Sequence, residues 1–162
     1  SEGVSGSGVG RLWAIGVVAE IALLLLSARL LRGLSPLALL WMGGIGAMIR
    51  WTAAGFAMPV VAAGAFQTLH AASFALTHLA TMRFLQKALE EERLPLAYAV
   101  NGALVFGPIL AFSSFMAGVA YDALAPGGAE FQSRIYWIMV LAAAGGLAVA
   151  AVTRPTVDKV GT

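Results

Sequence analysis

The amino-acid sequence predicts an all-α integral membrane protein, and two observations support this fold class. Of its 162 residues, 60% are hydrophobic and 11% are charged, and the mean hydropathy is +0.86. A soluble domain averages about 45–50% apolar and about 25% charged residues. The apolar residues also fall into runs of about 20, the length at which an α-helix crosses a bilayer core. We therefore expect the chain to cross the lipid bilayer several times.

Five spans are expected, with short polar or turn-forming segments between them. Their predicted boundaries are about residues 12–31, 36–57, 59–84, 96–120 and 131–151. Pro36 suits a first helical turn, and Gly107–Pro108 predicts a kink in the fourth span. Residues 86–96 are expected to form a solvated charged loop, and residues 121–130 a turn-rich loop. Because the chain starts without Met in a small, polar stretch, we expect a fragment of a longer protein.

The basic residues predict the orientation of these spans. Seven fall on one side and two on the other: Arg29, Arg32, Arg83, Lys87, Arg93, Arg154 and Lys159 against Arg11 and Arg134. Positive residues favour the cytoplasmic side, so we expect a multi-pass protein of the cell (inner) membrane with a cytoplasmic C-terminus. Trp13 is expected to be an interfacial aromatic. The net charge of +2 is too small to indicate a nucleic-acid partner, and without cysteine there is no disulfide or thiolate metal site.

The third span carries a stripe of polar side chains. Helix positions three, four, seven and eight apart share a side. One side of this span therefore carries Gln67, His70, Phe74, Thr77, His78 and Thr81. Polar groups are costly in hydrocarbon unless they face other helices or a water-filled cavity. We interpret the stripe as part of a transport pathway, with substrate or proton at its outer part and an inner exit lined by Thr77, His78 and Thr81.

Other polar or small residues have a structural interpretation beside the functional one. Asn101 of the fourth span is a further candidate for lining the pathway, but an interhelical hydrogen bond is the simpler explanation. Gly43 and Gly46 of the second span indicate close helix packing, and Arg50 shares their side. His78 alone is as well explained by packing as by function.

Three ionisable residues lie deep in separate spans. At about 1.5 Å per residue, Glu20 lies about 12 Å from the outer end of its span, Arg50 about 10 Å and His70 about 16 Å. These depths agree closely enough that the three side chains are expected to meet. An imidazole titrates near neutral pH and can relay a proton, whereas a guanidinium stays charged. A buried Glu–Arg pair that merely joins two helices is the competing interpretation. The two histidines are eight residues apart, so no metal site is expected.

The residues that carry these features resemble a known family. The chain is similar to the C-terminal half of a major facilitator superfamily transporter, in particular to the 3-phenylpropionic acid transporter group, which is related to lactose permease-like proton symporters. The matching segments are Leu12–Ile21, Arg50–Trp51, Leu69–Phe74, Thr77–Phe84 and Gly118–Asp122.

This resemblance implies that the five spans are transmembrane helices 8 to 12 of a twelve-helix fold, in which two halves rock to give alternating access. The N-terminal half of the same transporter would then be a partner of this chain. In lactose permease-like symporters, an acid of helix 8, an arginine of helix 9 and a histidine of helix 10 serve substrate and proton coupling. Glu20, Arg50 and His70 fall on those helices. Ser73 stands where those permeases have a glutamate one turn after the histidine.

The sequence therefore predicts proton-coupled uptake of a small organic solute, with an aromatic, phenylpropionate-like carboxylate as the favoured class. Glu20 and His70 are the proton-coupling candidates, and Arg50, Gln67, His70 and Phe74 the substrate-binding candidates. Trp51 is a second source of ring surface. A proton symporter for sugars or nucleosides is one alternative, and a membrane scaffold that transports nothing is another. No enzymatic activity and no cofactor are expected.

Overall fold

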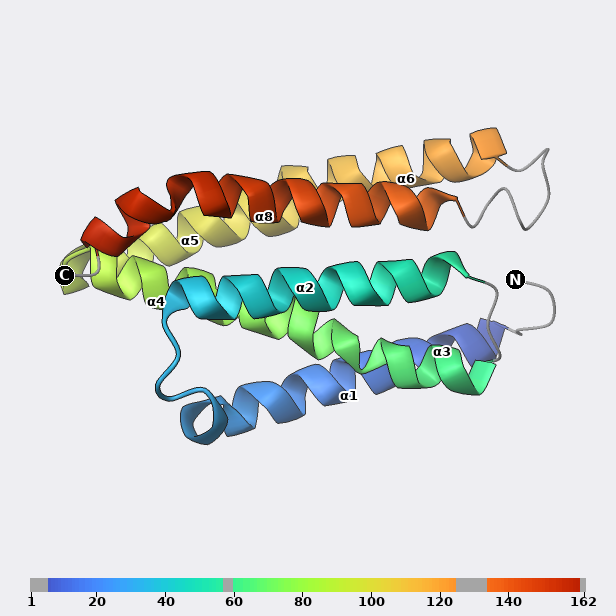
Figure 1. Ribbon diagram of the computed structural model, residues 1–162, viewed down its shortest axis with the longest axis horizontal. Coiled ribbons are helices and arrows are strands. Elements are labelled where there is room, and N and C mark those ends of the chain that lie inside the picture. Colours follow the sequence, from blue (N-terminus) through green and yellow to red (C-terminus); the bar gives the residue numbers. More distant parts are fainter. Residues whose placement is uncertain (1–5, 57–59, 125–133, 161–162) are drawn as a thin grey trace.

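The computed structural model describes residues 6–56, 60–124 and 134–160, which form an elongated bundle of helices (Figure 1). No β-strand occurs in these ranges, so the all-α class is confirmed. The α-helices are α1 (Gly6–Leu30), α2 (Pro36–Gly55), α3 (Val60–Gln67), α4 (Thr77–Ala88), α5 (Leu94–Leu104), α6 (Leu110–Leu124) and α8 (Ile135–Val160). Two π-helical segments, η1 (Ala71–Leu76) and η3 (Val105–Ile109), and a 3₁₀ turn, η2 (Glu91–Arg93), join some of them.

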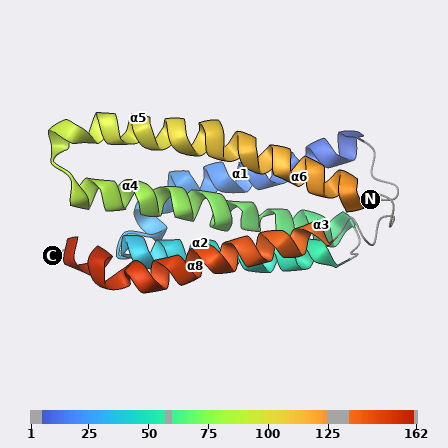
Figure 2. The ribbon, with the colours of Figure 1, turned by 90° about the horizontal axis from the view of Figure 1, so that it is seen from above.

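Four helical stretches of the described residues are long and apolar enough to cross a membrane. They are Gly10–Leu30, Pro36–Gly55, Glu91–Ala123 and Ile135–Thr153. The predicted span 59–84 is not among them. Its described part belongs to the central segment, residues 60–88, in which α3, η1 and α4 follow one another with a turn at Thr68. Figures 1 and 2 show this segment running along the bundle beside the long helices. That it crosses the membrane stays a prediction.

The turn between α1 and α2 is closed by local chemistry. Ser35 caps α2, because its Oγ accepts a hydrogen bond from the backbone N of Ala38 at 3.1 Å, and Pro36 opens the helix as predicted. Arg83 of α4 donates from Nη1 to the carbonyl oxygens of Leu31 at 2.8 Å and Leu34 at 3.0 Å. Arg83 thereby ties α4 to the turn between α1 and α2.

Two predicted loops are wrong in their extent. The charged segment 86–96 is mostly helical, since α4 continues to Ala88 and η2 begins at Glu91. The loop predicted for 121–130 begins in helix, because α6 runs to Leu124, and its remainder lies outside the described residues. The predicted kink at Gly107–Pro108 is confirmed, since Gly107 has non-helical angles of φ −89° and ψ −109°.

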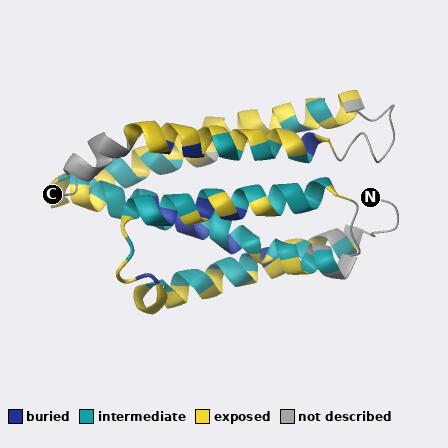
Figure 3. Cartoon of the chain, in the orientation of Figure 1, coloured by how far each residue is buried: buried dark blue, intermediate teal, exposed yellow. Residues whose placement is uncertain are grey.

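Packing concentrates on α2. This helix contacts α8 along its length and also η1 and α4, while η1 touches α1 on another side. The turn between α1 and α2, the turn between α4 and α5 and the end of α8 lie at one end of the bundle (Figure 2). A small core of Leu31, Leu39, Leu76 and Ala80 lies between α2, η1, α4 and the turn that follows α1. Figure 3 shows buried residues on α2 and the central segment and others on α8.

The outward faces of the bundle are apolar. Large exposed residues include Leu25, Phe112, Leu141 and Val152. A water-soluble protein rarely exposes so continuous an apolar surface, whereas lipid accepts it. The fold therefore agrees with the membrane environment that the sequence predicts.

Candidate functional site

Two glycines let α1 and α2 approach the central segment closely. A Cβ on Gly16 of α1 would lie 3.2 Å from the Cβ of His70, and one on Gly46 of α2 would lie 2.7 Å from the Cβ of Ala72. Glu20 follows Gly16 by four residues, and Arg50 follows Gly46 by four. Residues four apart share a helix face. Both charged side chains therefore emerge beside the contact with the central segment.

His70 links the two charged residues into a polar triad, defined as Glu20, His70 and Arg50. Nη1 of Arg50 lies 2.8 Å from Nδ1 of His70, and Nε2 of His70 lies 3.4 Å from Oε2 of Glu20. The predicted meeting of these three side chains is thus observed. The His70 and Glu20 side chains keep 23% and 17% of their surface exposed, so these two members of the triad are partly buried but still accessible.

The triad fixes the hydrogen positions on His70. A guanidinium has donors and no acceptor, so Nδ1 must accept the hydrogen bond from Arg50. In the neutral imidazole the hydrogen then sits on Nε2 and faces the Glu20 carboxylate. If Nδ1 takes up a proton, it can no longer accept from Arg50. Protonation of His70 and its hydrogen bond from Arg50 therefore exclude one another.

Arg50 is held by neutral groups as well. Its Nη1 also donates to Oγ of Ser73 at 3.1 Å, and that hydroxyl donates to the carbonyl oxygen of His70 at 3.2 Å. The Cζ atom of Arg50 lies 4.2 Å from the centroid of the Trp51 ring, which is a cation–π distance. Ser73 is thus an uncharged acceptor for Arg50.

Aromatic rings surround the imidazole. The ring of Phe74 stacks on that of His70 with centroids 5.7 Å apart, and the ring of His78 continues the stack at 6.4 Å from Phe74. The indole of Trp13 lies 6.3 Å from the His70 ring. Sequence reasoning placed Trp13 at the membrane interface and missed this contact. The available signal was spacing, because Trp13, Gly16 and Glu20 share one face of α1.

The hydroxyls of two predicted pathway residues donate hydrogen bonds to backbone carbonyls of their own helix. Thr77 donates to the carbonyl oxygens of Ser73 at 2.8 Å and Phe74 at 2.9 Å, and Thr81 donates to that of Thr77 at 3.0 Å. A Cβ on Gly43 would lie 2.7 Å from Cγ2 of Thr77, so this methyl group faces α2. A threonine hydroxyl that is bonded to a backbone carbonyl of its own helix offers little polar surface to a transport pathway.

Among the described residues, no hydrogen bond joins the two remaining candidates, Gln67 and Asn101, to the triad. Gln67 ends α3 one turn before His70, with its carbonyl oxygen against Gly16. Asn101 lies half-buried on α5. Among the described elements α5 packs mainly on η2, η3 and α4, so Asn101 is not brought to the triad. No three His, Asp or Glu side chains of the described chain lie together as a metal site requires.

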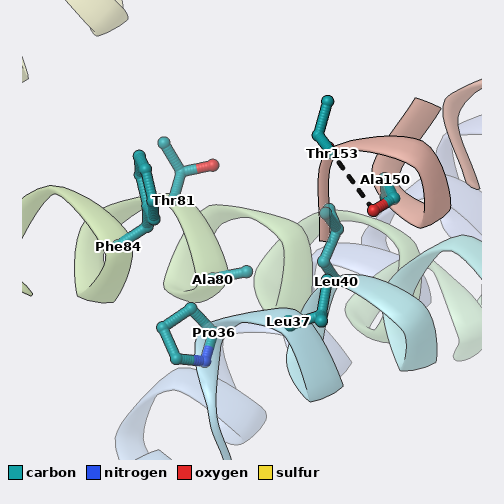
Figure 4. A pocket seen from close by; sticks show the side chains of 8 residues that line it. All are labelled: Pro36, Leu37, Leu40, Ala80, Thr81, Phe84, Ala150 and Thr153. Carbon is teal, nitrogen blue, oxygen red and sulfur yellow. Dashed lines mark hydrogen bonds between the residues drawn. The ribbon is translucent and has the colours of Figure 1, made fainter. Parts of the chain in front are cut away.

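A cavity of about 180 Å³ lies between α2, α4 and α8 (Figure 4). Its lining is mainly apolar and consists of Pro36, Leu37, Leu40, Ala80, Thr81, Phe84, Ala150 and Thr153. Thr81 is the one predicted pathway residue in that lining. It follows His70 by 11 residues, or about 16 Å along a helix. The cavity is therefore separate from the triad.

Comparison with known proteins agrees with the predicted resemblance. The profile of the MFS_1 like family matches residues 1–131. The chain is 33% identical over 141 residues to the "Probable 3-phenylpropionic acid transporter" of Escherichia coli (strain K12). The alignment covers 87% of this chain and 35% of that relative, so the chain spans about a third of the relative's length. No solved structure matches the chain.

Proposed function

Because the chain belongs to the MFS_1-like family of the major facilitator superfamily, we propose that its protein is a proton-coupled secondary transporter of a small organic acid. The observation that carries this proposal is the line of Glu20, His70 and Arg50, in which one imidazole touches both a carboxylate and a guanidinium. These groups come from three separate elements, α1, the central segment and α2. Relative movement of these elements would therefore change the contacts within the triad.

The triad supports coupling by a simple exchange of partners. With neutral His70, Nη1 of Arg50 is engaged by the imidazole and by Ser73. A proton bound at Nδ1 removes the first of these acceptors and adds a positive charge beside Arg50. Nε2–H then stays directed at Glu20, whose carboxylate stabilises the imidazolium. A substrate carboxylate gains from both changes, so proton and anion each favour binding of the other. That linkage is the requirement for symport.

The favoured substrate class is an aromatic carboxylate. The guanidinium of Arg50 suits a carboxylate, because its planar donors match the two oxygens. The rings near His70 suit an apolar, aromatic body. The E. coli relative carries 3-phenylpropionic acid in its name, and we extend that substrate class to this protein by proposal.

The remaining parts of the proposal concern the path and the setting. His78 and Thr81 continue from the triad toward the end of the bundle that carries the α1–α2 and α4–α5 turns. We place that end in the cytoplasm of a cell whose inner membrane holds the protein, following the basic residues. An N-terminal half of the same transporter would complete the substrate site and rock against this one.

The experiment that tests the proposal is substrate uptake by the intact protein with Glu20 replaced. Glu20→Gln keeps the shape of the side chain and removes its charge. We expect loss of uphill accumulation of 3-phenylpropionate under an imposed proton gradient, while exchange of labelled for unlabelled substrate persists. Glu90→Gln is the matched control, because Glu90 lies 75% exposed in a turn and should leave accumulation unchanged.

Three results would count against the proposal. Normal accumulation by the Glu20→Gln protein would remove Glu20 from coupling. Accumulation of a sugar or nucleoside, with no uptake of carboxylates, would favour the alternative symporter. A protein that is abundant and folded in the membrane but takes up none of these solutes would favour the scaffold.

A further inference from the structure

Trp13 lies on the face of α1 that meets the histidine. Gly16 marks that face, because a Cβ added there would lie 3.2 Å from the Cβ of His70. Trp13 precedes Gly16 by almost one turn, and Glu20 follows it by about one turn. The side chains of Trp13 and Glu20 therefore lie on either side of the point where α1 contacts His70. The indole is 6.3 Å from the His70 ring, and the carboxylate is 3.4 Å from Nε2.

The indole of Trp13 is available to a ligand, whereas that of Trp51 is occupied. Trp13 is 67% exposed although it contacts His70. Trp51 carries the guanidinium of Arg50 at 4.2 Å and stacks on Tyr136 with ring centroids 5.9 Å apart. A tryptophan that only anchors the protein in the lipid headgroups has no need to contact the imidazole of a half-buried polar triad. The position of Trp13 thus points to the site.

Arg50 leaves donors free for an anion beside this ring. Nη1 donates to both His70 and Ser73, which uses its two hydrogens. Within the described part of the chain, no side chain takes the hydrogens of Nε and Nη2. These two groups form one edge of the guanidinium, and such an edge binds a carboxylate through two parallel hydrogen bonds.

We propose that Trp13 is a specificity-determining residue, whose indole seats the aromatic ring of a carboxylate held by Arg50. This inference rests on the proposed function. The rings of Trp13 and Phe74 lie 6.3 Å and 5.7 Å from the ring of His70, and His70 in turn contacts the guanidinium of Arg50. The site therefore favours a carboxylate joined to a ring by a short spacer. Offset or tilted ring pairs are favourable beyond the burial of their apolar area.

The test compares two acids that differ only in aromaticity. Uptake of 3-phenylpropionate and of 3-cyclohexylpropionate is measured for the intact protein in membrane vesicles, and KM is determined for each. Trp13→Leu should raise KM for the phenyl acid about 3- to 10-fold relative to the cyclohexyl acid, as expected for the loss of one aromatic pair. Trp13→Phe should keep most of the preference. Trp137→Leu is the matched control, since Trp137 packs on Phe56 away from the triad.

Each result has a distinct meaning. An unchanged ratio of the two KM values in the Trp13→Leu protein overturns the assignment while the proposed function stands. An equal rise for both acids, or a similar loss in Trp137→Leu, also overturns it, because packing alone would then explain the effect. A wild-type protein that takes up neither acid overturns the proposed function, and the assignment falls with it.

Discussion

The two π-helical segments of the chain, η1 and η3, differ in their surroundings. Segment η1 (Ala71–Leu76) lies between α1 and α2, and its residues Ala71, Ala75 and Leu76 are buried. The described side chains of η3 (Val105–Ile109) are all exposed. The flanking residues of η1 have ordinary helical angles, whereas Gly107 within η3 departs from them.

These surroundings indicate different physical causes. In η3 the cause is local, because Pro108 lacks an N–H and its ring obstructs the carbonyl four residues earlier. Segment η1 contains neither glycine nor proline. Its close contacts come instead from Gly43 and Gly46 of α2, which bring backbone against Ala72 and Thr77. A π-helical turn is often found at a functional site, and this one carries Ser73 and Phe74 directly after His70.

The largest effect is expected at Arg50, which joins α2 to η1 and to His70. Arg50→Ala removes the hydrogen bonds to His70 and Ser73. The proposed substrate carboxylate also loses its two hydrogen bonds to the guanidinium, each of which contributes about 1.5–3 kcal/mol, so carboxylate uptake should fall about 100-fold or more. Arg50→Lys should restore little, because an ammonium lacks the planar fork. Uptake at matched abundance in the membrane measures the effect.

Arg11→Ala is the matched control for this change. Arg11 is exposed, and its Nε donates to the carbonyl oxygen of Ser7 within the same helix at 3.4 Å. Its loss should leave uptake within about 2-fold, in line with the small contribution of exposed charges. A fall in thermal stability of the Arg50→Ala protein that matches its loss of uptake would instead assign Arg50 a purely structural role.

A second, smaller effect should distinguish the packed segment η1 from the exposed segment η3, through the stability of two glycine variants. A Cβ at Gly46 would lie 2.7 Å from that of Ala72, so Gly46→Ala forces α2 away from η1 and should cost about 1–3 kcal/mol. Nothing lies within 4 Å of a Cβ at Gly102, just before η3. Gly102→Ala should stabilise its helix by about 0.5–1 kcal/mol. Thermal unfolding of the intact protein in detergent measures both. Equal shifts would mean that η1 does not depend on α2.

The site and the two π-helical segments differ in how far the sequence alone predicts them. Counting residues along straight helices predicts that Glu20, Arg50 and His70 lie at a similar depth along their helices. The missing N–H and the ring of Pro108 predict the kink. The π-helical turn at η1 has no such local signal, because the segment contains neither glycine nor proline, and its contacts are with α1 and α2. Those contacts depend on glycines distant in sequence.

The stripe of polar residues was predicted less well for a related reason. Counting Thr77 and Thr81 as polar ignores that a threonine hydroxyl can bond to a carbonyl of its own helix, as both do here. Trp13 was assigned from its position at a span end, although its spacing from Glu20 carried the better signal. Residue spacing thus predicts where the site lies along its helices, whereas the direction of individual side chains can be seen only in the folded structure.

The smallest effect is expected at Pro108, where the cause of the irregularity is local. Pro108→Leu restores a backbone N–H that can donate to the carbonyl of Leu104, so residues 104–110 should become more regular. We expect slower amide hydrogen exchange in this stretch of the intact protein and a change in stability below about 1 kcal/mol. Exchange at η1 should stay as it was, because its contacts with α1 and α2 are untouched. Faster exchange at both segments would show that they are coupled through the bundle, and the distinction between a local and a packed π-helical turn would then be wrong.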